Sequence, residues 1–78
     1  MNLELIILEI LEGAAPRLLK RKVLFSQAAL ETDGLTESAF SQAITLLDRK
    51  KQIWIDAGED VTRIKITPDG LARIAETR

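Results

Sequence analysis

The sequence predicts a small, mainly α-helical domain that carries one antiparallel β-hairpin. Two observations lead to this prediction. Residues 35–52 read as one capped amphipathic helix, and at residue 53 the apolar period changes from the helical 3.6 to the strand period of 2. The chain has 78 residues, which is the length of one small domain, so we expect residues 1–78 to form a single unit.

The composition excludes several kinds of chemistry. The chain has no cysteine and no histidine, which rules out disulfides, thiolate or imidazole metal sites, and Ser-His or Cys-His catalysis. A site built from carboxylates alone stays open, but we expect no cofactor and no enzyme. The net charge is −1, from eleven Lys and Arg against twelve Asp and Glu. Because non-specific nucleic-acid binders are usually strongly basic, local patches must decide whether this chain binds nucleic acid.

The start of the chain carries no apolar run long enough for a signal peptide or a membrane span. We therefore expect a cytoplasmic protein with no membrane partner. A chain this short buries only about 60% of its unfolded surface, and oligomerisation is a common route to added stability. A homodimer is therefore an expectation.

The first helix is predicted over residues 2–12, with a wide apolar face and an acidic face. Leu5 and Leu8 do not fit this division, because both fall within or beside the acidic sector. Either the following segment of the chain covers them, or they form the seam of a homodimer. Pro16 cannot continue the helix and ends it after Gly13.

Residues 17–32 form a second helical segment whose apolar residues point to two faces. Leu19 and Leu30 lie on one face, whereas Leu24 and Ala28 lie on another. The segment is either covered on two sides or broken near residues 21–23 into a short and a longer helix, and we favour the break. Gly34 then supplies a left-handed turn.

The helix over residues 35–52 has two contrasting faces. Thr36 is a suitable N-cap, and Glu37 lies favourably in the positive first turn. The buried stripe consists of Phe40, Ala43, Ile44 and Leu47. The opposite face is formed by Ser38, Ser41, Gln42, Thr45 and Arg49. Such a face is either simply solvated or suited to a polar surface such as the base edges of a DNA groove.

The hairpin pairs residues 53–56 with residues 62–66, and its inward face carries Ile53, Ile55, Ile64 and Ile66. We expect this face to pack on the helices, because an isolated hairpin is marginal in water. Trp54, Arg63 and Lys65 point outward. Trp54 either packs on the stems of Arg63 and Lys65 or under the N-terminal segment, or it anchors a contact with a partner. Thr67 then caps a last helix that begins at Pro68.

The order helix, helix, turn, helix, hairpin, helix resembles a winged helix-turn-helix domain. Residues 35–53 look like the recognition helix and first wing strand of MarR-like and PadR-like regulators, which end that helix with a Leu, charged residues and an apolar strand start. Residues 64–70, Ile-Lys-Ile-Thr-Pro-Asp-Gly, resemble the segment by which such domains leave the wing. The resemblance implies a three-helix core, a two-stranded wing and a C-terminal helix.

The resemblance also implies a DNA-binding transcription regulator that acts as a homodimer on double-stranded DNA. In such domains the recognition helix lies in the major groove. Carried over to this sequence, the candidates for base contact are Ser38, Ser41, Gln42 and Thr45. The candidates for phosphate contact are Arg17, Lys20, Arg21, Lys22, Arg49, Lys50, Arg63 and Lys65.

The predicted wing tip departs from this pattern. Asp56, Glu59 and Asp60 are acidic, and their carboxylates would repel phosphate, so we expect that the tip does not touch DNA. Glu37 and Asp48 also flank the recognition face. The alternative is a winged helix that serves as a protein-interaction or dimerisation module without DNA binding. Catalysis is disfavoured, because the acidic loop has no pocket-forming sequence around it.

Overall fold

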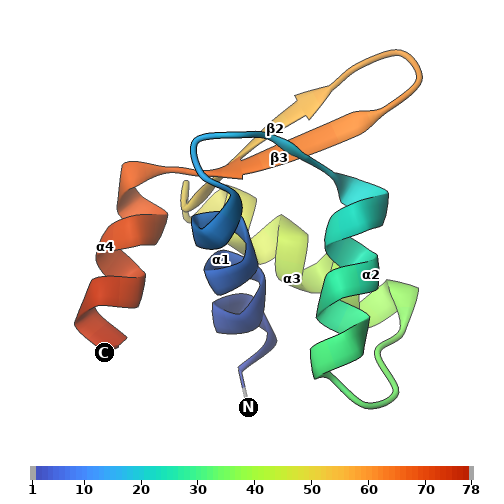
Figure 1. Cartoon of the computed structure of the whole chain (residues 1–78), viewed down its shortest axis with the longest axis horizontal. Helices are drawn as coiled ribbons and strands as arrows, with labels where there is room; N and C mark the ends of the chain where they lie inside the picture. The colour runs from blue at the N-terminus through green and yellow to red at the C-terminus, as the bar shows by residue number, and fades with distance from the viewer. Residues whose placement is uncertain (1, 78) are drawn as a thin grey trace.

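The computed structural model describes residues 2–77, which form four helices and a three-stranded antiparallel sheet. Figure 1 shows the wing hairpin projecting beyond the helices, with both ends of the chain on the side away from the sheet. In chain order the elements are α1 (Leu3–Ala14), β1 (Leu19–Lys20), α2 (Arg21–Glu31), α3 (Glu37–Arg49), β2 (Ile53–Ala57), β3 (Thr62–Ile66) and α4 (Pro68–Thr77).

Local side-chain chemistry sets where α3 and α4 begin. The hydroxyl oxygen of Thr36 accepts a hydrogen bond from the Ala39 amide at 3.1 Å, and that of Thr67 accepts one from the Gly70 amide at 3.2 Å. Gly34 has φ +69°, a left-handed conformation that glycine adopts without strain. Both predicted caps and the predicted turn are therefore confirmed.

The predicted hairpin is confirmed in its strands and in its inward isoleucine face. Ile53 lies opposite Ile66, and Ile55 lies opposite Ile64, so the four isoleucines share one face. Ile53, Ile64 and Ile66 are buried and Ile55 is half-buried. This face joins the sheet to the helices.

The segment before α2 differs from the prediction. The chain does break at Arg21, but the residues before the break form the strand β1 and not a short helix. Leu19 pairs with Ile64, and Lys20 pairs with Arg63. The open edge of β3 offers unpaired backbone groups, and pairing with them places Leu19 against the core. The sheet therefore has three strands, and the prediction of a two-stranded wing was incomplete.

Helix α2 buries one face only. Leu24 and Ala28 have no exposed surface, whereas Val23 is 38% and Leu30 is 87% exposed. The alternative in which both apolar faces are covered is therefore wrong.

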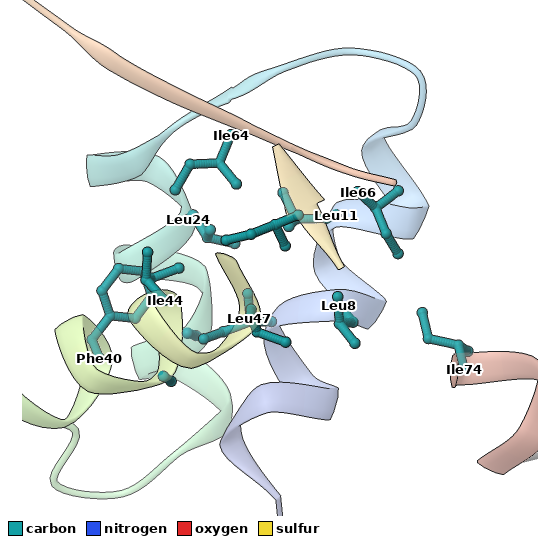
Figure 2. Packing of buried hydrophobic residues seen from close by; sticks show 13 residues of the cluster. Leu8, Leu11, Leu24, Phe40, Ile44, Leu47, Ile64, Ile66 and Ile74 are labelled. Atoms are coloured by element: carbon teal, nitrogen blue, oxygen red, sulfur yellow. The ribbon is translucent and has the colours of Figure 1, made fainter. Parts of the chain in front are cut away.

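The hydrophobic core lies where α3 meets the other elements. Its predicted stripe of Phe40, Ala43, Ile44 and Leu47 is buried, as expected. These residues belong to one buried cluster with Leu8, Leu11, Leu24, Ile64, Ile66 and Ile74. Figure 2 shows Phe40, Ile44 and Leu47 on one side of this cluster and Ile74 of α4 on the other, beyond Leu8. The core therefore holds α3 in place while its opposite face stays outside.

The core decides between the two alternatives for Leu8, coverage by the chain itself or a homodimer seam, in favour of coverage. This side chain has no exposed surface, because it belongs to the same buried cluster as Leu11 of α1 and Ile74 of α4. Helix α4 packs against α1 and covers the side of α1 on which Leu8 lies. Leu8 therefore has no surface for a second copy of the chain, whereas Leu5 is half-buried at the edge of the cluster.

The Thr-x-x-Gly segment at the start of α4 has a structural reason. The Thr67 hydroxyl donates to the Lys51 carbonyl at 2.7 Å, so it ties α4 to the end of α3 while it caps α4. A Cβ atom on Gly70 would collide with the Gln52 carbonyl oxygen and the Ile66 side chain. Only glycine allows this close approach of α4 to the α3–β2 connection.

Candidate nucleic-acid interface

The outward face of α3 carries a shallow depression of about 420 Å³. It is lined by Ser38, Ser41, Gln42, Thr45, Leu46 and Arg49. All four candidates for base contact thus lie together with Arg49, and most of these side chains are exposed. The sequence reasoning missed Leu46, which is 40% exposed. Its spacing of four residues from Gln42 was the available signal, since such residues are neighbours on a helix.

The depression combines chemical groups that can read base edges. Gln42 offers an amide that can donate and accept, and the hydroxyls of Ser38 and Thr45 can do either. Leu46 adds an apolar surface of the kind that meets a thymine methyl group. Arg49 adds a positive charge and a planar set of N–H donors. The face is therefore chemically able to contact both bases and backbone.

Two of the predicted contact residues are already bound within the protein. One Nη atom of Arg21 lies 2.6 Å from a Glu37 carboxylate oxygen and donates to the Ser41 hydroxyl at 2.8 Å. The Arg21 guanidinium also lies 5.0 Å from the centre of the Phe40 ring. The start of α2 is thereby joined to the first turns of α3. We name this group of residues 21, 37 and 41 the Arg21 corner.

A second hollow, of about 510 Å³, lies beside the Arg21 corner. It is lined by Lys20, Arg21, Lys22, Phe25, Glu37, Asp60, Val61 and Thr62. Lys20 and Lys22 are exposed, so both remain accessible to phosphate. Asp60 brings the acidic wing tip to the same hollow, which therefore holds both signs of charge.

The other predicted phosphate contacts are scattered. Arg17 and Arg63 are exposed, but neither lines the depression on α3. Lys65 lies over the Trp54 ring, with Nζ 5.2 Å from its centre. Trp54 is 47% exposed, and of the partners predicted for it the structure brings the Lys65 ammonium to its ring.

Lys50 belongs to an ionic cluster on another side of α3. Its Nζ lies 3.1 Å from a carboxylate oxygen of Glu4, and Nη1 of Arg73 lies 2.8 Å from the same oxygen. Arg73 also donates to the Gln52 side-chain oxygen at 2.8 Å. We name this group of residues 4, 50, 52 and 73 the Glu4 corner.

The Glu4 corner shifts the titration of its carboxyl. The hydrogen bond from Arg73 lowers the pKa of Glu4, burial opposes this, and Lys50 adds to the lowering. The sequence reasoning missed Arg73. Its position directly before the buried Ile74 was the available signal, because it places the guanidinium at the edge of the packed face of α4.

At the wing tip the acidic residues Glu59 and Asp60 are exposed. Asp56 is half-buried, and its cross-strand neighbour on β3 is the cationic residue Arg63. Among residues 2–77, no cluster of three or more metal-ligating side chains is present. Nor does any helix in that range have the length and apolar character needed to cross a membrane.

Comparison with known proteins identifies the fold. No protein-family model and no curated protein sequence matches the chain. The structure is similar to that of the PcaV transcriptional regulator from Streptomyces coelicolor, solved in complex with its natural ligand, with a TM-score of 0.73 and 18% sequence identity. The match covers 97% of this chain and 50% of the PcaV chain, so this chain spans half the length of that protein. PcaV is a MarR-family winged helix regulator, and the predicted winged helix fold is therefore confirmed.

Proposed function

We propose that this chain binds double-stranded DNA through α3 and acts in the regulation of transcription. The depression on α3 carries the proposal, because it places Ser38, Gln42, Thr45 and Arg49 on one accessible face of a helix anchored in the core. The winged helix fold is consistent with this use, since such domains present the equivalent helix to the major groove.

Each side chain of the depression has a proposed part. Gln42 pairs with an adenine edge through its amide, and Ser38 and Thr45 bond to neighbouring base edges. Arg49 binds a backbone phosphate. Lys20 and Lys22, at the start of α2, bind phosphate on the side of the second hollow.

The acidic wing tip limits this interface. The carboxylates of Glu59 and Asp60 would repel a nearby phosphate. The wing therefore contributes little to binding, and the contacts come from α2 and α3. With few phosphate contacts, we expect modest affinity for random DNA and a shallow dependence on salt.

Fluorescence anisotropy with a random duplex and with a duplex selected from a random pool tests the proposal. We expect binding at about 50 mM salt and tens of micromolar protein, because non-specific binders reach roughly 0.1 mM or better at physiological salt. Gln42→Ala should reduce the preference for the selected duplex. Gln27→Ala is the matched control, since Gln27 is an exposed helical glutamine on α2 that lines neither hollow. Absence of binding by the wild-type chain would overturn the proposal.

A second candidate function is a protein-interaction or dimerisation module. Trp54, Leu71 and Leu30 are 47%, 41% and 87% exposed, and large apolar side chains of this kind are common at interfaces. Homodimerisation through the edge of α1 near Leu5 remains part of this candidate. Multi-angle light scattering measures the oligomeric state directly. A monomeric mass at several hundred micromolar protein would exclude homodimerisation.

A further inference from the structure

The Arg21 guanidinium makes three contacts of different kinds, two within the Arg21 corner and one with the Phe40 ring. Glu37 supplies a carboxylate at 2.6 Å, Ser41 supplies a hydroxyl acceptor at 2.8 Å, and Phe40 supplies a ring whose centre is 5.0 Å away. The side chain of Arg21 is 29% exposed, whereas that of Glu37 is 62% exposed. The carboxylate is therefore the member of the corner that meets solvent most.

Arg21 has a contact that does not involve Glu37. Its guanidinium lies over the ring of Phe40, which is fully buried and packs edge-to-face on Phe25. The Ser41 hydroxyl accepts from Arg21 at 2.8 Å and donates to the Glu37 carboxylate at 3.5 Å, so it contacts both members of the ion pair. A guanidinium binds carboxylate and phosphate through the same N–H groups. If Glu37 turns away, Arg21 presents to the second hollow a donor set that suits a phosphate.

The second hollow is a suitable place for that phosphate. Lys20 and Lys22 line it together with Arg21, so three cations from adjacent positions of the chain face one space of about 510 Å³. Two carboxylates, of Glu37 and Asp60, line the same space. Of these two, Glu37 is the one that neutralises a cation of the cluster directly.

We propose that Glu37 occupies the position that a DNA backbone phosphate takes on Arg21, and that duplex binding exchanges one anion for the other. Glu37 is thus an internal competitor that lowers affinity for DNA. The inference rests on the proposed function and adds to it a residue that sets affinity without touching a base.

The exchange has a modest cost, because a partly exposed ion pair contributes little to stability. It acts on all sequences alike, since phosphate contacts carry no sequence information. We therefore expect Glu37→Gln to tighten binding to random and selected duplexes by the same factor, about threefold to tenfold at about 50 mM salt.

A matched variant separates competition from simple charge removal. Asp48→Asn removes one carboxylate from the same helix, and Asp48 is exposed and forms no ion pair within residues 2–77. It should tighten binding by less than Glu37→Gln, because it changes the general repulsion of phosphate and frees no cation.

A double-mutant cycle with Arg21→Gln provides the decisive test. Anisotropy with random duplex is measured for the wild type, each single variant, and the two double variants that combine Arg21→Gln with Glu37→Gln or Asp48→Asn. In the Arg21→Gln background, Glu37→Gln should gain no more than Asp48→Asn does. Circular dichroism checks that each variant is folded. If Arg21→Gln unfolds the chain, Arg21→Met replaces it, because methionine keeps an apolar stem beside Phe40 and carries no charge.

A second measurement uses the wild-type chain. The side-chain carboxyl carbon of Glu37 is followed by NMR while duplex DNA is added, with Glu4 as the reference carboxyl outside the hollow. We expect the Glu37 signal to move and the Glu4 signal to stay. Equal gains for Glu37→Gln and Asp48→Asn, or a Glu37 gain that survives the loss of Arg21, would overturn the inference while leaving DNA binding intact. Absence of duplex binding by the wild type overturns the proposed function itself.

Discussion

The protein has two ionic corners built from similar groups, and they differ in how far they are closed to solvent. In the Glu4 corner the side chains of Glu4 and Arg73 are 17% and 21% exposed, and α1, α4 and the end of α3 meet there. In the Arg21 corner the side chains of Arg21 and Glu37 are 29% and 62% exposed beside a hollow.

The burial of an ion pair determines whether its carboxylate can change partners. A carboxylate shielded from water and bonded to two cations is costly to separate, so Glu4 fastens α4 to the domain. A carboxylate that already meets water exchanges partners at little cost, so Glu37 is free to give way to another anion. Substitutions that disturb the Glu4 corner should therefore reduce stability more than those in the Arg21 corner.

The largest effect is expected for Gly70→Ala, which forces apart the elements that close the Glu4 corner. The new Cβ would collide with the Gln52 carbonyl oxygen and the Ile66 side chain. We expect a loss of about 3 kcal/mol or more in urea unfolding. Gly13→Ala is the control, since nothing lies within 4 Å of its added Cβ, and it should stabilise the chain by about 0.5–1 kcal/mol. Similar stability of the two variants would contradict the close approach of α4.

Glu4→Gln should have the next largest effect, about 1–2 kcal/mol at neutral pH, because it leaves two cations without their shared carboxylate. Since the folded protein lowers the pKa of Glu4 below its ordinary 4.5, the contribution is complete above that pH and is lost as the pH falls below it. The stability difference from wild type should therefore be constant at neutral pH and shrink as the pH falls below 4.5.

Glu9→Gln serves as the control for Glu4, since Glu9 is an exposed carboxylate on the same helix. It should change the free energy of unfolding by less than about 0.5 kcal/mol at any of these pH values. A difference between wild type and Glu4→Gln that does not change with pH would refute the role of the carboxylate charge.

Thr36→Ala tests the N-cap of α3, the helix that carries Glu37 and Ser41 of the Arg21 corner. It removes the hydroxyl that accepts from the Ala39 amide, and an N-cap lost in this way costs about 1 kcal/mol. Thermal unfolding measures the loss, and Thr36→Ser should restore most of the stability because serine also caps helices. A serine variant as unstable as the alanine variant would show that the cap is not the cause.

Glu37→Gln should have the smallest effect on stability, below about 0.5 kcal/mol, because its ion pair is open to solvent. Together with a clear loss for Glu4→Gln, this result would show that the two corners differ in their contribution to stability. A loss as large as that of Glu4→Gln in parallel urea titrations would contradict this difference, and would mean that Glu37 fastens the fold.

The sequence predicted the features that depend on neighbouring residues. The helix start at Thr36, the turn at Gly34 and the alternation from Ile53 to Ile66 are local patterns, and the structure confirms them. The resemblance to MarR-like domains gave the order of these elements correctly.

The features that it missed depend on contacts between distant parts of the chain. β1 exists because β3 offers it an open edge, and Leu8 is buried because α4 returns along α1. Arg73 and Glu4 are 69 positions apart, and no local pattern indicates that they meet. At the candidate site, Ser41 was correctly placed on the outward face, but its bond to Arg21 of the preceding helix could not be seen in either segment alone.

The most direct test of the central claim is a two-dimensional amide NMR titration of the chain with duplex DNA. We expect the largest shifts at Ser38, Gln42 and Thr45 on α3 and at Lys20 and Lys22 beside the second hollow. Shifts confined to the surfaces around Trp54 or Leu71, or no shifts at all, would contradict the proposal that α3 is the DNA-binding surface.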